Sequence, residues 1–306
     1  MKVFYDDAYN IDLGLLNFIH PFDGRKFRKV ANAVAGMENM SIVGPDGPIS
    51  MREVDSFSDA LLKLLLRKKR YILRALEVPY LPLVPMSFVD NRILSPMRWG
   101  VAGTLKAARE ALLGTCCWNL AGGYHHASRA SVEGFCIYND IGITVDVLVR
   151  EGLLADDARI LIIDIDAHHG NGNAYVFMER SQVTILDIYN GAIYPMNGYT
   201  RERVNINIPL ESGTGGVLYL ERLKEGLSRL DESCDLAFVV AGTDVLSSDP
   251  LGGLNLSIDD CVRRDMMVFE KLRSISAPSV FLGGGGYSSD SATAMIGSLK
   301  GLGNAR

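Results

Sequence analysis

The sequence lacks most of the features that mark secreted, membrane-spanning and nucleic-acid-binding proteins. Its five cysteines are odd in number and form no Cys-x-x-Cys pair, which argues against a disulfide framework. No apolar run approaches the roughly 18 residues that cross a bilayer, and Asp6 and Asp7 stand where a secretory signal would be apolar. The net charge of −5 disfavours nucleic acid as a partner. We therefore expect a cytoplasmic protein with free thiols, no membrane span and no direct contact with nucleic acid.

Several common catalytic motifs are also missing. The chain contains no G-x-G-x-x-G, G-x-x-x-x-G-K-[ST], H-E-x-x-H or G-x-S-x-G. These absences weaken a dinucleotide-binding, P-loop, zincin or serine-hydrolase interpretation. Internal repeats, low-complexity stretches and Pro- or Ser-rich linkers are absent too, so we expect residues 1–306 to form one domain.

Short apolar runs alternate with amphipathic stretches along the chain. This alternation predicts an α/β fold whose parallel sheet is covered by helices on both faces. A leucine-rich stretch over 61–76 carries several basic residues, and we expect an amphipathic helix with a solvated basic face there rather than a membrane-surface helix. The expected strands are 2–5, 116–121, 159–166, 183–189, 236–241 and 279–282, and the expected helices are 104–113, 141–150, 216–230 and 259–274.

Histidine is scarce but clustered. Only five occur, and four of them form the adjacent pairs His125-His126 and His168-His169. The second pair ends a strand-like run that carries acids at alternate positions. Because side chains two apart on a strand point the same way, three side chains would project together, those of Asp164, Asp166 and His168. Buried carboxylates need a cation or hydrogen bonds, so metal ligation explains this group better than two capping aspartates and a solvent histidine.

Asp244 is the best candidate for a third protein ligand. Catalytic zinc normally takes three protein ligands and keeps one position for water. Asp244 follows the apolar run 236–240 in a Gly-Thr-Asp loop at a strand end. Considered alone, an aspartate there is equally typical of a turn or a helix cap. A donor set of carboxylates and imidazole suits zinc, with ferrous iron or manganese as alternatives.

The other histidine pair and the tyrosine that follows a run of four glycines supply further polar groups. His125 and His126 follow two glycines at a strand end, and adjacent histidines serve better as general base and acid than as ligands of one metal. The four glycines precede Tyr287, whose hydroxyl could donate a hydrogen bond to a developing oxyanion. Hydrogen-bonded loop histidines, a flexible linker and a phosphate nest are the alternative interpretations.

Taken together and in this order, the motifs resemble those of the zinc-dependent histone deacetylases, which have the arginase–deacetylase fold. The matching segments are 122–127, 134–140, 164–172, 241–244 and 283–287. Other segments are similar to the class IV branch of that family, namely 20–27, 187–190, 193–195, 242–244 and 249–254. The resemblance implies a single three-layer α/β domain with an eight-stranded, mainly parallel sheet and helices on both faces.

The resemblance also implies roles for individual residues. One catalytic Zn²⁺ would be held by Asp166, His168 and Asp244. His126 would be the general base and acid, with His125 as its electrostatic partner, Asp164 bonded to His125, and Tyr287 polarising the acyl carbonyl. An acyl-lysine tunnel would be lined by Gly134, Phe135, Tyr194 and Gly285. Asp164 would also help to bind a structural K⁺, and main-chain oxygens around Asp166, His168, Asp187 and Ile188 would complete the shell of that ion.

Four details depart from the family pattern or stay open. Asn171 stands where many members carry Asp as the partner of the second histidine, so we expect His126 to titrate lower than it would beside Asp. His169 stands where class IV relatives can have Gln, and we do not expect it to be essential. Asp90 is a candidate for the acidic rim residue from its loop position alone. The segment 20–26 resembles the loop behind the metal.

The resemblance predicts a metal-dependent hydrolase that removes acyl groups from lysine side chains of proteins or peptides. Acetyl and long-chain fatty acyl groups both stay open as substrates, with the class IV similarity slightly favouring long chains. A deacetylase of polyamines or other small N-acyl amines is the main alternative. An arginase-like enzyme with two manganese ions and a non-catalytic acyl-lysine reader are weaker ones. The oligomeric state and the metal bound in the cell stay open.

Overall fold

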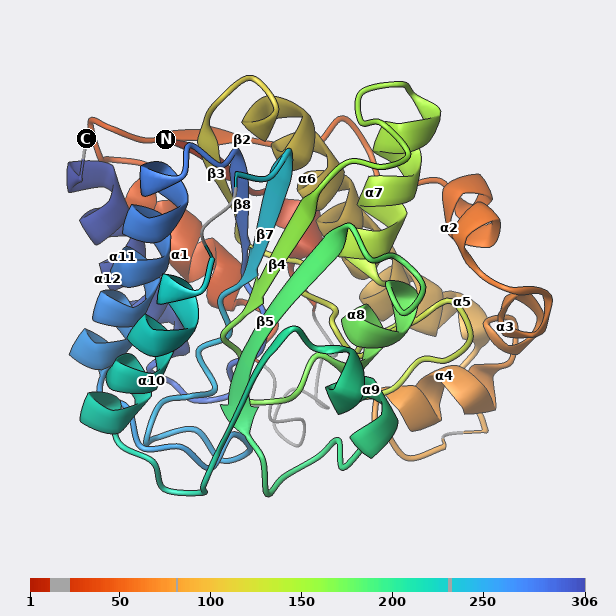
Figure 1. Ribbon diagram of the computed structural model, residues 1–306. Coiled ribbons are helices and arrows are strands. Elements are labelled where there is room, and N and C mark those ends of the chain that lie inside the picture. Colours follow the sequence, from red (N-terminus) through yellow and green to blue (C-terminus); the bar gives the residue numbers. More distant parts are fainter. Residues whose placement is uncertain (12–22, 81, 231–232, 306) are drawn as a thin grey trace.

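The computed structural model describes residues 1–11, 23–80, 82–230 and 233–305 (Figure 1). One sheet has the strand order β2-β1-β3-β8-β7-β4-β5-β6, and its neighbouring strands pair in parallel. The central strands β4 and β7 bury every residue, which is why they form unbroken apolar runs in the sequence. The strands are β1 (Lys2–Phe4), β2 (Ser41–Val43), β3 (Cys116–Asn119), β4 (Ile160–Asp164), β5 (Val183–Asn190), β6 (Ile206–Leu210), β7 (Leu236–Val240) and β8 (Ser279–Leu282).

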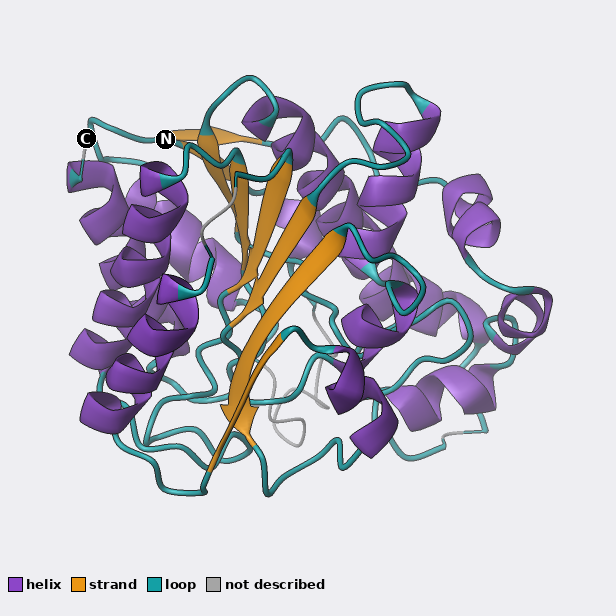
Figure 2. Ribbon diagram, in the orientation of Figure 1, coloured by secondary structure: helices purple, strands orange, loops and turns teal. Residues whose placement is uncertain are grey.

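Helices cover both faces of this sheet (Figure 2). Alternate residues of β4 belong to different cores: Ile160 and Ile162 pack in the core that α6 and α7 share, and Leu161 and Ile163 in the core of α1, α10, α11 and α12. The predicted three-layer α/β fold is therefore confirmed. The covering helices are α1 (Lys26–Val34), α6 (Ser95–Ala111), α7 (Asp140–Arg150), α10 (Gly216–Ser228), α11 (Ile258–Ser274) and α12 (Ser291–Asn304).

Shorter helices gather beyond α7 and around the carboxyl ends of the strands (Figure 1). None of the described helices is long and apolar enough to cross a membrane, and the five cysteines are free. The shorter helices are α2 (Met51–Phe57), α3 (Ala60–Leu65), α4 (Lys69–Ala75), α5 (Met86–Val89), the π-helical turn Asp90–Leu94, α8 (Asn171–Val176) and α9 (Gly198–Arg203).

Several parts of the fold differ from the pattern-based expectation. The helix expected over 104–113 begins already at Ser95, and α1 and α12 were not expected. The edge strands β2 and β6 were not among the expected strands, because β2 has only three residues and β6 contains a proline and exposed positions. The expected helix over 61–76 is wrong in extent: α3 and α4 are separated by the segment 66–68. Leu61 and Leu64 are exposed while Leu62 is buried, so the leucines do not form one stripe and a turn is needed before Ile72 can be buried.

Candidate metal centre and active site

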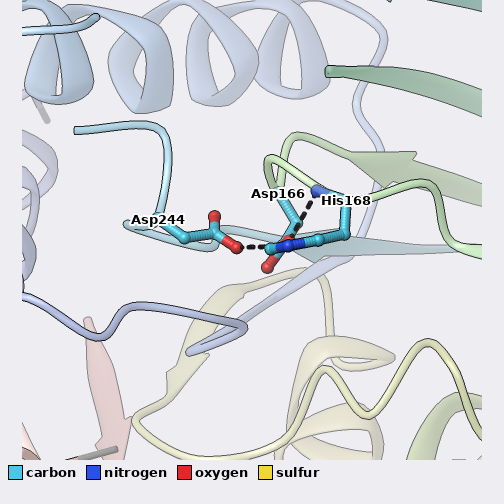
Figure 3. Close-up of side chains that lie close together, drawn as sticks. All are labelled: Asp166, His168 and Asp244. Atoms are coloured by element: carbon cyan, nitrogen blue, oxygen red, sulfur yellow. Dashed lines mark hydrogen bonds and ion pairs between the residues drawn. The ribbon is translucent and has the colours of Figure 1, made fainter. Parts of the chain in front are cut away.

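The loops that follow β3, β8, β7 and β4 carry most of the predicted site residues, and these strands are neighbours in the sheet. Asp166 and His168 follow β4, and Asp244 follows β7. One potential ligand atom from each of the three lies within 4.8 Å of the others. Figure 3 shows the three side chains close together, and His168 Nδ1 lies 2.8 Å from Asp244 Oδ2 and 3.2 Å from Asp166 Oδ1. The chain thus brings together the three residues predicted to hold the metal.

The electrostatics of this group fit a bound cation. Burial lowers the pKa of His168, but the carboxylates of Asp166 and Asp244 outweigh it and raise that pKa to about 11. Burial and the neighbouring Asp166 raise the pKa of Asp244 to about 7. Two almost fully buried carboxylates share one partner here, which is costly unless positive charge lies between them. Two oxygen donors and one nitrogen donor are a set that zinc accepts.

Backbone hydrogen bonds orient both carboxylates. Asp244 Oδ1 accepts from the amide of Ala167 at 2.9 Å, and Asp166 Oδ2 accepts from the amide of Gly285 at 2.8 Å. The alternative interpretation as loop-capping aspartates is therefore partly correct, because each carboxylate also closes a loop. Each retains an oxygen beside His168, at which a metal could be held.

Pattern reasoning missed a buried arginine behind the metal centre. Arg264 on α11 has a side chain with 0% exposure. Its Nη1 donates to the carbonyls of Ile165 at 2.8 Å and Gly242 at 2.6 Å. These carbonyls belong to the two loops that supply the metal ligands. The sequence did contain an indication of this role. Arg264 lies on the buried face of α11 with Cys261 and Val268, and a charged side chain is buried only where it has partners.

The two adjacent histidines have different partners and opposite pKa shifts. Nδ1 of His125 lies 2.8 Å from Asp164 Oδ2, and Nδ1 of His126 lies 2.7 Å from Asn171 Oδ1. Burial lowers the pKa of His125, but Asp164 and Asp166 raise it to about 9. Burial, with the nearby His125 and His168, holds the pKa of His126 well below its usual value. At neutral pH His125 is thus suited to carry positive charge and His126 to accept a proton.

The four-glycine turn after β8 reaches the metal ligands and presents Tyr287. A Cβ on Gly285 would lie 2.5 Å from Asp244 Oδ2, so only glycine allows this approach. The amide of Tyr287 donates to Asp249 Oδ2 at 2.7 Å. Burial, with Asp244 and Asp166 nearby, raises the pKa of Tyr287 well above its usual value, so the hydroxyl remains a donor. Asp249 was not predicted, and it anchors Tyr287 through the backbone.

The predicted tunnel residues surround the histidines. Gly134 and Phe135 have φ of 53° and 62°, a left-handed turn that is unusual for phenylalanine and typical of functional sites. The turn places the Phe135 ring 5.6 Å from that of Tyr287. The Tyr194 ring lies 5.2 Å from that of His126. A Cβ on Gly134 would lie 2.4 Å from the His126 ring, so a side chain there would obstruct the site.

A mainly apolar cavity that opens to solvent extends from these residues. His125, His126 and Tyr287 line it together with Gly134 and Phe135. Past them, the wall is formed mainly by apolar side chains, among them Ile11, Phe27, Leu76, Val78, Ile93 and Met97.

The residues predicted to bind K⁺ lie behind His125. Asp164 and Asp187 face each other in the register of β4 and β5, and Ile188 is the next residue of β5. Asp187 Oδ2 accepts from the amide of Gly170 at 3.0 Å and lies 2.6 Å from His169 Nδ1. Its Oδ1 is buried without a hydrogen-bond partner. An orphaned carboxylate oxygen at this position fits a cation ligand.

Three weaker sequence predictions have specific surroundings. His169 is fully buried, and its Nε2 lies 2.9 Å from Thr200 Oγ1, which indicates a structural role. The Asp90 carboxylate is held by Arg98 at 2.8 and 3.1 Å, so it is already engaged. Residues 20–22 of the loop predicted behind the metal lie outside the described residues, whereas buried Lys26 donates to the carbonyl of Gly286 at 3.3 Å.

Comparisons with known proteins point to one family. The family model described as histone deacetylase domain matches residues 66–300. The chain is 32% identical to histone deacetylase 2 of Arabidopsis thaliana over 99% of this chain and 78% of that protein. It is 35% identical to the acetoin utilization protein AcuC of Staphylococcus aureus over 55% of this chain and 46% of that protein.

Solved structures with low sequence identity share the fold. An HDAC homolog from Aquifex aeolicus matches with a TM-score of 0.76 at 21% identity, over 100% of this chain and 84% of that one. An HDAC homolog complexed with SAHA matches with a TM-score of 0.73 at 22% identity, over 99% and 82% of the two chains.

Proposed function

Because the chain belongs to the histone deacetylase family, we propose that this deacetylase is zinc-dependent and hydrolyses N-acyl-lysine side chains of proteins or peptides. One observation carries the proposal: Asp166, His168 and Asp244 converge at one edge of the sheet, beside two histidines and a tyrosine that line one cavity. A zinc ion held by these three residues would act as a Lewis acid on the acyl carbonyl and activate a water molecule.

The residues of the chain then divide the proton transfers and the charge stabilisation. His126, neutral because its pKa is low, takes a proton from the attacking water and later gives it to the leaving lysine amine. The Tyr287 hydroxyl, which stays protonated, donates a hydrogen bond to the carbonyl oxygen as negative charge develops there. His125, whose pKa is about 9, contributes a fixed positive charge.

Asp164 and Asp187 support a proposed K⁺ site behind this centre. Burial raises the pKa of Asp164 to about 6, with His125 acting in the opposite direction and Asp187 adding to the rise. A monovalent cation at the orphaned Asp187 Oδ1 would offset this buried negative charge. The ion would stabilise the ends of β4 and β5, and therefore the position of the loop that carries Asp166 and His168.

The cavity supports long-chain acyl groups as substrates, in keeping with the class IV resemblance. An acetyl group needs no space beyond the histidines, whereas a fatty acyl chain needs an apolar cavity such as the one walled by Val78, Ile93 and Met97. Transfer of each methylene from water contributes about 0.8 kcal/mol when it is fully buried. We therefore expect turnover of a myristoyl-lysine peptide to exceed that of the acetyl-lysine peptide.

A paired substitution tests the path of the acyl chain. Ile93 and Leu94 are neighbours on the π-helical turn and both are buried, but only Ile93 lines the cavity. Ile93→Phe should lower turnover of the myristoyl peptide about 10-fold or more and spare the acetyl peptide, because the added ring narrows the cavity. Leu94→Phe is the matched overpacking control. Equal losses on both peptides in both variants would show that the cavity does not bind the acyl chain.

Small N-acyl amines are a second candidate substrate class. Burial is the largest cause of the raised pKa of the Tyr194 hydroxyl, and the nearby Glu133 and Glu77 add to the rise. Negative charge at this position would attract a polycation such as an acetylated polyamine. Turnover of an acetylpolyamine without turnover of either lysine peptide would favour this class over the first.

A further inference from the structure

The proposed catalytic base is held by an amide, and that amide is held by a carboxylate. Asn171 Oδ1 lies 2.7 Å from His126 Nδ1. On its other side, Asn171 Nδ2 donates to Glu133 Oε1 at 2.5 Å. Asn171 is 5% exposed and Glu133 is half-buried. The three side chains form a continuous line of hydrogen bonds from the imidazole to the tunnel wall.

The chemistry of these groups determines which way each one faces. An ionised carboxylate only accepts hydrogen bonds, whereas an amide donates at one end and accepts at the other. Glu133 therefore selects the orientation in which Asn171 turns Nδ2 toward the carboxylate and Oδ1 toward the imidazole. Because the amide oxygen only accepts, Nδ1 of His126 must carry the proton. Nε2 then keeps the lone pair with which it can accept a proton.

We propose that Glu133 is a positioning residue that fixes the tautomer of His126 through Asn171. This proposal rests on one part of the proposed function, the role of His126 as the general base. With the amide reversed, Asn171 Nδ2 would donate to His126 Nδ1, and the proton would move to Nε2. That tautomer cannot take a proton from water. Without a carboxylate at residue 133, nothing in the line of hydrogen bonds selects between the two orientations.

The local backbone places Glu133 for this role. It begins the left-handed turn that carries Gly134 and Phe135, and the amide of Cys136 closes that turn on the Glu133 carbonyl at 2.9 Å. The same turn therefore determines the position of the tunnel phenylalanine and of the carboxylate. Asn171 is the first residue of α8 and follows the metal-binding loop. Glu133 thus connects the tunnel wall to the loop that carries His168.

Two single substitutions should impair the reaction in different ways. Glu133→Gln replaces the obligatory acceptor with an amide that can face either way, so both tautomers of His126 become populated. Asn171→Asp places a second carboxylate at hydrogen-bond distance from Glu133, and the two repel. We expect each variant to lower kcat about 10-fold with little change in KM, as loss of an orienting partner typically does. Glu179→Gln, a charge change at an exposed residue, is the matched control.

The double variant Glu133→Gln/Asn171→Asp is the decisive test. The introduced glutamine can donate to the introduced aspartate, which then accepts from His126 Nδ1 and restores the productive tautomer. We expect kcat to recover above that of either single variant, to within about 3-fold of the wild type. If the two residues acted only through the general structure, the fold-losses of kcat in the single variants would multiply in the double variant. Such a result would overturn the proposal.

A second measurement does not depend on turnover. ¹⁵N NMR of the zinc-loaded protein reports which imidazole nitrogen of His126 is protonated. We expect protonated Nδ1 in the wild type and in the double variant, and a mixture in Glu133→Gln. The same tautomer in the wild type and Glu133→Gln would refute the role of Glu133, even if no acyl-lysine substrate were turned over. If the protein did not hydrolyse acyl-lysine but the proposal about Glu133 held, the wild type and Glu133→Gln would still differ in the tautomer of His126.

Discussion

At the scale of the residue, His125 and His126 show how neighbouring groups of one type acquire opposite properties. Their ring centroids are 4.1 Å apart, and the charge of His125 helps to lower the pKa of His126. Asp164 supplies a full negative charge to His125, whereas Asn171 supplies only a dipole to His126. Burial lowers the pKa of both rings, but only His125 has carboxylates close enough to reverse that effect, so the two histidines are suited to different roles.

The low pKa of His126 predicts an unusual acid limit for catalysis. Burial is the largest cause of that low pKa, so we expect the base to stay neutral as the pH falls through 6.5, the ordinary value for histidine. kcat/KM should then decline only at a lower pH. The measurement is a pH–rate profile in which zinc content is determined at each pH. A half-maximal rate at pH 6.5 or above, with zinc still bound, would contradict the assignment.

Tyr287 provides a second prediction at the same scale. Its hydroxyl is the proposed oxyanion donor, so Tyr287→Phe should lower kcat by about 10², the effect of removing one such donor, and zinc should stay bound. Tyr175 is 45% exposed on α8, and Tyr175→Phe provides the matched control. Near-normal turnover by Tyr287→Phe would exclude the hydroxyl from the chemistry.

At the scale of the element, parallel strands assemble the site. The strands β3, β8, β7 and β4 are far apart in sequence but adjacent in the sheet. Ligands bind beyond the carboxyl ends of such strands. Apolar runs ending in Asp, His or Gly were thus enough to predict which loops meet. Edge strands and the break between α3 and α4 were not predictable in this way, because short or exposed segments carry little periodic pattern.

The residues that support the site were harder to predict than the ligands. Glu133 precedes a turn with no pattern of its own, and its role depends on a contact with Asn171 on another element. Arg264 has a weak signal, a charge on the buried face of α11. Asp249 acts through the backbone of Tyr287. Each of these contacts joins residues distant in sequence, which local patterns do not reveal.

Arg264 leads to a prediction about how α11 supports the metal centre. Arg264→Lys should weaken zinc binding about 10-fold, because one ammonium group cannot reproduce the guanidinium contacts with the carbonyls of Ile165 and Gly242. Ser298→Ala removes the bond to Asp265 in the same buried cluster without touching those carbonyls. Zinc competition against a chelator compares the two variants. Equal zinc affinities would mean that Arg264 contributes only to stability.

At the scale of the whole molecule, the helices on the two faces of the sheet support different parts of the site. Helices α1, α10, α11 and α12 pack against one face, and from this layer Arg264 reaches the metal-binding loops. On the other side, the cavity is lined by Leu76, which directly follows α4, by Ile93 of the π-helical turn and by Met97 of α6. The proposed metal centre is therefore supported from the layer of α1, α10, α11 and α12, whereas much of the cavity wall comes from short helices and loops. Such segments can change without loss of the core.

The most direct test of the central claim is a zinc titration of metal-stripped protein while turnover of acetyl-lysine and myristoyl-lysine peptides is measured. We predict no turnover without metal, a rise that saturates at about one Zn²⁺ per chain, as expected for a three-ligand site, and none in His168→Ala at any zinc concentration. Turnover by metal-free protein, or a requirement for a second Zn²⁺ per chain, would contradict the account.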